Sequence, residues 1–276
     1  MPNQINLSHN SVYEFQLKEL SGFIRPRGHY HGLTLFANGH PITRPGTCTI
    51  NLEHYCARGD GSGCFVPRNQ CQTTYNVDSD RLSISFEETE TWKVKCMMTF
   101  QLQEDDCIDV SVDFAFSQSY ARFEAFIASY FYEQRIPFLR VGEEWIQPHI
   151  EPKQQLFFTR DDDGSELVVD GRWDWLKERG LCAENDGRKY SLPIIVAWNQ
   201  ENHRALIQMV EFTKCSAVSV NTFAYAQDLS LIGEDVYAGQ QVSAKVRLLY
   251  REVRDLEAVI EWYEAWDTDN QTTKIQ

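Results

Sequence analysis

Apolar and polar side chains alternate over a long central stretch of the chain, and this pattern constrains the fold more than any other feature. Residues 92–102 carry Trp, Val, Cys, Met, Phe and Leu at every second position. After the acidic turn Glu104–Asp106, the alternation resumes over residues 108–116. Successive side chains of a strand point to opposite faces of a sheet. The pattern therefore predicts a long hairpin with one buried face and one face in water.

Further strands are predicted where short apolar runs lie between turn residues. Residues 82–86 would extend the hairpin to a meander, and residues 242–250 repeat its alternation. Together these runs predict about a dozen strands. The remaining ones cover residues 13–17, 47–55, 154–159, 166–169, 194–198, 205–212 and 217–226. The segment Asp161–Glu166 contains an Asp-Gly pair, which is typical of a hairpin turn.

Helix signals are few. An apolar stripe at three- and four-residue spacing between Leu256 and Trp266 predicts a C-terminal helix, and residues 173–179 suggest a short second one. Many antiparallel strands without the rhythm of parallel crossovers favour an all-β fold, a large antiparallel two-sheet sandwich. No linker, internal repeat or low-complexity segment divides the sequence. We therefore expect a single β-sandwich domain over residues 1–276.

The charge balance excludes two classes of partner. The chain carries 40 acidic and 26 basic side chains, which gives a formal net charge of -14. A field of this sign repels phosphate backbones and anionic lipid headgroups, so we expect neither nucleic acid nor a membrane as a partner. Neither a spanning apolar run nor a signal peptide is recognisable, which favours a cytoplasmic location. The oligomeric state is left open.

Several kinds of chemistry lose support because their motifs are absent from the sequence. The eight cysteines lack the paired spacing of a zinc site, and in a cytoplasmic chain they are expected to be reduced and structural. The sequence also lacks the glycine-rich nucleotide motifs, the serine-hydrolase elbow and the histidine pair of zinc proteases. We expect no cofactor.

The central hairpin carries a resemblance to a known superfamily. Residues 91–114, a long strand, an acidic turn and a second long strand, resemble the central hairpin of galactose mutarotase-like (aldose epimerase-like) proteins. The run Phe126–Phe131 is similar to sugar-related proteins of the same fold. The resemblance implies a β-supersandwich, the fold of aldose epimerases and of domains of many glycoside hydrolases and polysaccharide lyases. Aldose epimerases carry a catalytic His directly after this hairpin, whereas this chain has Ser117–Tyr120, so it would be a divergent member.

The densest polar cluster of the sequence is Arg25–Gly32, and it is the first candidate site. In an extended segment His29 and His31 would lie on one face, about 6 to 7 Å apart. Two such histidines could share acid and base work on a sugar ring or ligate a metal. Arg25 and Arg27 could bind a carboxylate or phosphate of the substrate. The alternative is one packed and one solvated histidine.

The second candidate is the segment Asn51–Tyr55. On a regular strand, Asn51, Glu53 and Tyr55 share the wet face, where Glu53 is a plausible general base and Tyr55 a substrate contact. His54 would then lie on the apolar face, where a histidine is more often a packing residue than a catalytic one. A β-bulge would reverse these faces.

Two further segments carry aromatic and polar groups that suit a sugar. The Pro-flanked loop around residues 145–151 offers Trp145 as a stacking platform and His149 with Glu151 as an acid/base pair. Trp173 is another candidate platform. Each could equally be a packing residue or part of a solvated loop.

Three functions remain open. The first is a carbohydrate-active enzyme that binds a sugar or sugar acid in the concave cleft and transfers protons, as an epimerase, mutarotase or lyase does. The second is a non-catalytic carbohydrate-binding or regulatory protein of the same fold, which the missing epimerase histidine favours. The third is a metal-dependent cupin-like enzyme that uses His29, His31 and Glu53.

Overall fold

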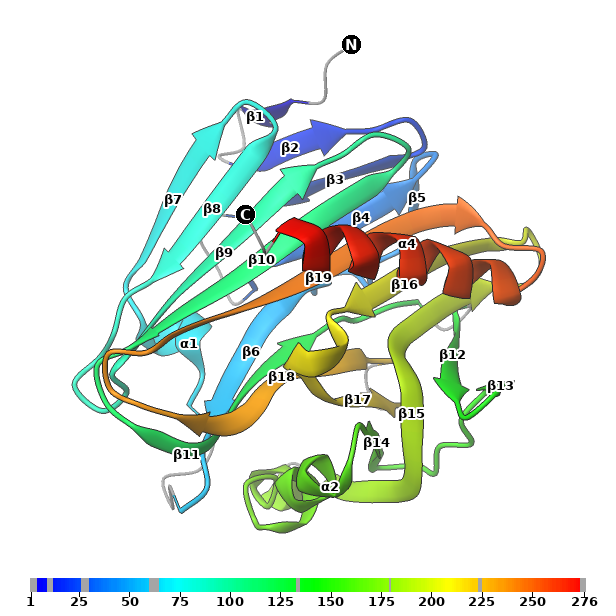
Figure 1. Ribbon diagram of the computed structural model, residues 1–276. Helices are drawn as coiled ribbons and strands as arrows, with labels where there is room; N and C mark the ends of the chain where they lie inside the picture. The colour runs from blue at the N-terminus through cyan, green and yellow to red at the C-terminus, as the bar shows by residue number, and fades with distance from the viewer. Residues whose placement is uncertain are drawn as a thin grey trace.

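The computed structural model describes residues 4–8, 12–25, 30–59, 65–132, 135–178, 180–222 and 225–273, and Figure 1 shows how they are arranged. These residues are mostly in strands, which form two large sheets and a smaller N-terminal sheet. The expected all-β sandwich with a C-terminal helix is confirmed.

One large sheet, here called the long sheet, contains the hairpin predicted from the alternating pattern. β9 (Val94–Leu102) and β10 (Cys107–Phe116) pair antiparallel, and their alternate apolar positions are buried. β19 (Gln241–Glu252) pairs with the other edge of β10. The sheet also contains β15, described below, and the strands β7 (Thr73–Asp78), β8 (Arg81–Phe86), β12 (Ile136–Val141), β13 (Glu144–Ile146) and β16 (Arg204–Val210).

The second large sheet, here called the short sheet, has the antiparallel order β6-β11-β18-β17-β14. The bounds are β6 (Asn51–Cys56), β11 (Tyr120–Ala128), β14 (Gln154–Thr159), β17 (Cys215–Asn221) and β18 (Gln227–Val236). The sequence patterns missed β11 and β18.

β15 (Cys182–Asn199) belongs to both large sheets. Its first half runs parallel to β14, and its second half pairs antiparallel with β16 and β12. Pro193 lies between the two halves, where the register of the β12 pairing shifts. Because proline has no N–H to donate, it is tolerated at such an irregular point. This strand carries the chain from one layer of the sandwich to the other.

The segment after β14 corrects the expectation for residues 161–169. Instead of a hairpin turn and a strand, it forms α2 (Asp162–Val169), and α3 (Trp175–Glu178) follows. The Asp161 side chain caps α2 by accepting a hydrogen bond from the Gly164 amide at 2.8 Å. The two helices form a crossover, so β14 and β15 pair in parallel where only antiparallel pairs were expected.

The predicted C-terminal helix is α4 (Glu257–Thr273), which lies across the outer face of the long sheet (Figure 1). Its apolar stripe, Val259, Tyr263 and Trp266, packs against outward-facing residues of β15 and β16. The remaining helical turns are α1 (Pro67–Gln70) and the 3-10 turn η1 (Phe212–Lys214).

The N-terminal sheet is tied to the central hairpin by one carboxylate. It consists of β1 (Ile5–Leu7), β2 (Tyr13–Gln16), β3 (Leu20–Ile24), β4 (Leu33–Ala37) and β5 (His40–Pro41). Asp106, in the turn between β9 and β10, accepts hydrogen bonds from the Glu19 and Leu20 amides at 2.7 and 2.8 Å. Asp106 is buried, so this contact anchors the start of β3 to the long sheet.

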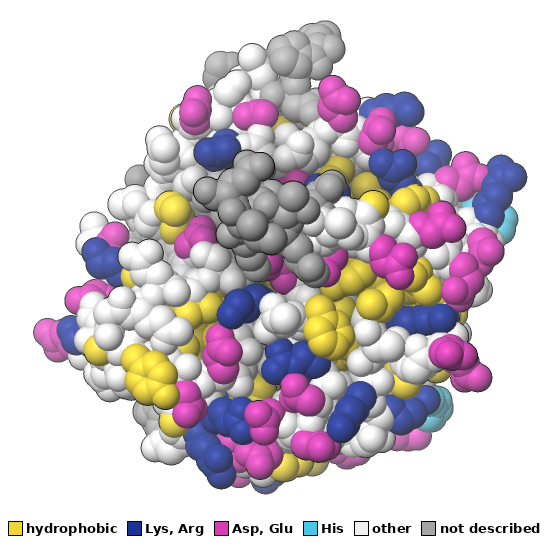
Figure 2. Space-filling view, viewed as in Figure 1, with side chains coloured by type: hydrophobic (Ala, Val, Ile, Leu, Met, Phe, Trp, Pro, Cys, Tyr) yellow, Lys and Arg dark blue, Asp and Glu magenta, His cyan; other side chains and the backbone are white. Residues whose placement is uncertain are grey.

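The described surface is mixed in charge. Figure 2 shows acidic and basic side chains interspersed with small apolar patches over one face of the molecule. Among the described residues, no helix has the length and apolar character needed to span a bilayer.

Candidate functional site

The outer face of the short sheet carries a group of buried polar side chains. The inner positions of its strands, such as Leu156, Val218 and Leu229, belong to the core of the sandwich. The alternate positions point the other way. The buried polar residues at such positions are Glu124, Gln155, Ser219, Asn221 and Asp228. Carboxylates are rarely buried without a partner, so this face is a candidate functional site.

A β-bulge in β6 adds Glu53 to this group. Opposite β11, Phe126 pairs with His54 and Ile127 pairs with Leu52, so Glu53 is the extra residue. The bulge changes the expected faces: Tyr55 has no exposed surface and packs in the core against Phe65, Trp92 and Phe123. Tyr55 is therefore a core residue and not part of the site.

Glu53 is held by a cation and an amide. The Arg68 guanidinium, on α1, forms a salt bridge with the Glu53 carboxylate, and both side chains are about nine-tenths buried. Asn51 Nδ2 donates a hydrogen bond to Glu53 Oε2 at 2.6 Å. The guanidinium carbon of Arg68 also lies 4.9 Å from the centre of the Tyr30 ring. These partners hold the Glu53 side chain in one position.

His31 reaches the same cluster from a different part of the chain. Its amide donates to Asn51 Oδ1 at 3.0 Å, and its Nε2 lies 3.4 Å from the Arg68 carbonyl oxygen. Burial lowers the pKa of His31, which favours the neutral ring. Nε2 then donates to the carbonyl, and Nδ1 accepts the hydrogen bond from the Tyr75 hydroxyl.

Gly32 permits the close approach of His31 to β6. A Cβ atom at this position would lie 2.1 Å from the Thr49 carbonyl oxygen and 2.8 Å from that of Ile50. Only glycine fits there without moving the backbone. The predicted pair His31 and Glu53 is thus brought together, bridged by Asn51 and Arg68.

Asp228, on β18, is another buried carboxyl group of this face. Its Oδ1 accepts a hydrogen bond from the Ser129 amide at 3.2 Å, and its Oδ2 accepts one from Gln155 Nε2 at 2.9 Å. Burial raises the pKa of Asp228 to about 8, and the charge of Glu53 contributes to the rise. Asp228 therefore retains its proton at neutral pH.

Tyr130 lies within electrostatic range of both carboxyl groups. Burial raises the pKa of its phenol well above the ordinary value, and the charges of Glu53 and Asp228 raise it further. The Tyr130 ring also makes an edge contact with Tyr30, with the ring centres 5.7 Å apart. We call the group Tyr30, His31, Glu53, Arg68, Tyr130 and Asp228 the carboxyl cluster.

The other residues predicted from the sequence are not part of the carboxyl cluster. Arg25 contacts Thr34 at 3.4 Å and lies over the Phe23 ring. His149 and Glu151 form an exposed pair, 2.9 Å apart, in the loop after β13. Trp145 lies near Arg140 on the β12–β13 hairpin. His29 and Arg27 fall outside the described residues.

Trp173 is placed in an aromatic box and not in an open cleft. It is 2% exposed, and its ring packs against Phe126 and Phe157, each with ring centres 4.7 Å apart. His54 stacks on the Phe126 ring at 4.6 Å and meets the Trp173 ring at 4.9 Å. The ring that could have stacked on a sugar therefore packs against protein.

Sequence reasoning missed Arg68, Tyr130 and Asp228. Arg68 follows a proline in a short polar segment and gives no periodic signal. Asp228 alternates with Leu229 and Leu231, which could have indicated a strand with a polar outer face. Nothing local indicates that these residues meet Glu53.

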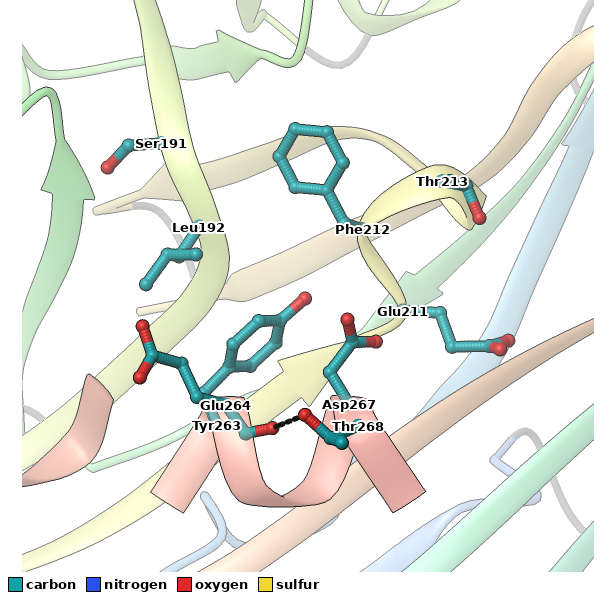
Figure 3. A pocket seen from close by; sticks show the side chains of 9 residues that line it. All are labelled: Ser191, Leu192, Glu211, Phe212, Thr213, Tyr263, Glu264, Asp267 and Thr268. Atoms are coloured by element: carbon teal, nitrogen blue, oxygen red, sulfur yellow. Dashed lines mark hydrogen bonds between the residues drawn. The ribbon is translucent and has the colours of Figure 1, made fainter. Parts of the chain in front are cut away.

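Two other features of the described residues do not form a site. Within the described residues, no cluster of three or more His, Cys, Asp or Glu side chains is placed to hold a metal ion. A pocket between α4, β15 and η1 is lined by the carboxylates Glu211, Glu264 and Asp267 (Figure 3). Glu211 already accepts a hydrogen bond from the Lys245 amide at 2.9 Å. An acidic hollow of this kind does not by itself indicate a ligand.

Comparison with known proteins shows which fold this chain has. No protein family and no curated protein matches the sequence. A putative aldose 1-epimerase from Escherichia coli K12 superposes with a TM-score of 0.61 at 10% identity, over 88% of this chain and 99% of that one. The galactose 1-epimerase of Lactobacillus acidophilus superposes with a TM-score of 0.50 at 9% identity, over 91% and 98%. This chain has the galactose mutarotase-like fold.

A longer enzyme contains the same fold as one part. An α-N-acetylgalactosaminidase from Bifidobacterium bifidum, solved in complex with GalNAc, superposes with a TM-score of 0.58 at 10% identity. The match covers 93% of this chain and 39% of that enzyme. The solved structures that share this fold thus include carbohydrate enzymes.

Proposed function

We propose that this protein binds a sugar or sugar acid at the outer face of the short sheet and transfers protons on it through Glu53 and Asp228. The observation that carries the proposal is a pair of buried carboxyl groups on one face with opposite surroundings. The Glu53 side chain contacts the Arg68 guanidinium and the Asn51 amide, whereas burial raises the pKa of Asp228 to about 8. Two carboxyl groups in different environments can divide the roles of base and acid in proton transfer.

The simplest reaction for such a pair is interconversion of sugar anomers. Glu53 would accept the proton of the anomeric hydroxyl while Asp228 donates its proton to the ring oxygen, and the bond between the anomeric carbon and that oxygen breaks. Closure on the opposite face of the aldehyde reverses both transfers, so no other reactant is consumed. Asp228 is 1% and Glu53 7% exposed, so the substrate has to displace part of the cover above the pair.

The test measures anomer exchange by NMR with galactose, glucose and their uronic acids, above the rate in buffer. We expect Glu53→Gln and Asp228→Asn each to lower the enzymatic rate by about 100-fold or more, because each removes one proton-transfer group. Glu90→Gln changes an exposed carboxylate outside the cluster and is the matched control. Equal rates in all four proteins would overturn the acid/base assignment.

A non-catalytic sugar-binding role is the second candidate, and the burial of the cluster favours it. The Glu53 charge is already neutralised by Arg68, and both Asp228 oxygens already accept hydrogen bonds. On this alternative, calorimetry detects sugar binding that Glu53→Gln weakens, while the wild-type protein exchanges anomers no faster than buffer. If the sugars neither bind nor exchange, both proposals are wrong.

A further inference from the structure

A second cavity lies at the end of the sandwich, between β12, the loop after β13 and the connection from β17 to β18. It has a volume of about 270 Å³. Polar groups line it together with an apolar wall that includes Ile136, Pro137 and Pro148. We call it the end pocket; its polar residues are Arg135, Gln147, His149, Asn221, Thr222 and Gln227. This size suits one small polar molecule.

Gln227 lines the end pocket and carries a buried side-chain acceptor next to it. The residue is 2% exposed, and among the described residues its Oε1 has no hydrogen-bond partner. Its backbone is held firmly: the amide donates to the Ser129 carbonyl at 2.9 Å, and the carbonyl accepts from Gln208 Nε2 at 3.4 Å. A buried acceptor without a donor is unfavourable, so a ligand that supplies a hydroxyl group would satisfy it.

Arg135 supplies a positive charge to the same cavity. Its guanidinium carbon lies 6.0 Å from the centre of the Tyr250 ring. Among the described residues, Nη1 has no hydrogen-bond partner, while the guanidinium interacts with the Tyr250 hydroxyl. Burial lowers the pKa of Arg135, and the Tyr250 hydroxyl opposes part of that shift. A planar guanidinium in this state is suited to a carboxylate.

We propose that the end pocket binds a small carboxylate-bearing polyol, a monomeric sugar acid, with its carboxylate on Arg135 and a hydroxyl on Gln227. Asn221, Thr222 and Gln147 offer further amide and hydroxyl partners for the polyol. The apolar wall contacts the C–H groups of the ligand. This site shares no residue with the carboxyl cluster, so it goes beyond the proton transfer proposed there.

The test titrates the full-length protein with D-galacturonate and, separately, with D-galactose, and follows the backbone amides by NMR. We expect galacturonate to shift the Thr222, Ala226 and Gln227 amides in a saturable way, and galactose to shift them at least about tenfold more weakly. Absence of these shifts, or equal affinity for the two sugars, would overturn the proposal.

Two variants test the assigned contacts. Arg135→Gln is expected to weaken galacturonate binding about tenfold or more and to remove the preference over galactose. Gln227→Leu is expected to weaken binding of both sugars, with circular dichroism used to confirm that each variant is folded. Arg140→Gln is the matched control on the adjoining strand β12, because Arg140 pairs with Glu257 at 3.0 Å outside the pocket. If Arg135→Gln binds like Arg140→Gln, the assignment is wrong.

Glu53→Gln separates this proposal from the proposed function. The variant alters only the carboxyl cluster, so the shifts at Thr222, Ala226 and Gln227 should saturate at the same galacturonate concentration as in the wild type. Loss of those shifts in Glu53→Gln would show that the sugar acid binds at the carboxyl cluster and not in the end pocket.

Discussion

The environment of Asp228 makes the stability of the protein depend on pH. Its carboxyl pKa is raised from 3.8 to about 8, chiefly by burial. Between these two values the folded protein keeps a proton that the unfolded chain has released. Unfolding then releases a proton, so the free energy of unfolding falls as the pH rises.

We therefore expect Asp228 to lower the free energy of unfolding of the wild type as the pH rises from about 4 to 8. The decrease is up to about 1.4 kcal/mol per pH unit, and Asp228 causes no further decrease above pH 8. Asp228→Asn does not titrate and should lack this loss. The measurement is urea unfolding of both proteins across this pH range. A difference in stability between them that stays constant, or that moves in favour of the wild type with rising pH, would contradict the prediction.

At the residue scale, the sequence predicted the chemistry of Glu53 but not its surroundings. Its assignment as a candidate base needed only a carboxylate on a strand. Its salt bridge with Arg68, its hydrogen bond from Asn51 and its electrostatic coupling to Asp228 depend on contacts across the fold. Arg68 and Asp228 lie far from Glu53 in the chain, and the bulge changes the face on which Glu53 lies. No local sequence pattern therefore indicates these contacts.

α2 is the element for which local signals were present and were misread. The Asp-Gly pair within residues 161–166 suggested a hairpin turn, yet Asp161 accepts a hydrogen bond from the Gly164 amide and begins a helix. An aspartate followed by acidic residues in the first turn is the pattern of a helix N-terminus. Packing decided the outcome: Leu167 and Val168 of α2 are buried.

We expect Asp161→Ala to lower the free energy of unfolding by about 1 kcal/mol, because the N-terminal amides of α2 lose their capping acceptor. Asp161→Asn keeps a side-chain oxygen in the same place and should lose much less. Both are measured by urea denaturation. If the two substitutions destabilise the protein equally, the effect belongs to the ion pair between Asp161 and Arg160 and not to the cap.

At the scale of the whole molecule, we propose that residues 1–276 form one domain. β15 pairs with strands of both large sheets, and Asp106 ties the N-terminal sheet to the central hairpin. Neither large sheet can lose its structure without removing a neighbour from β15. A chain connected in this way is expected to unfold as one cooperative unit.

Scanning calorimetry tests this directly. We expect one unfolding transition, with the calorimetric enthalpy equal to the van't Hoff enthalpy. Asp106→Ala should shift that single transition to lower temperature, because the Glu19 and Leu20 amides lose a buried acceptor. Two separated transitions in the wild type would show that the N-terminal sheet or one of the layers unfolds independently.

The sequence by itself determined the central hairpin, the all-β class and the C-terminal helix. These depend on the periodicity of apolar side chains, which is written along one continuous segment and tells which face of that segment is buried. Only the tertiary structure decided the parallel crossover, the bulge at Glu53 and the meeting of His31, Glu53 and Arg68. Each of these depends on which segment lies alongside another, and that pairing is set by packing between residues distant in the chain.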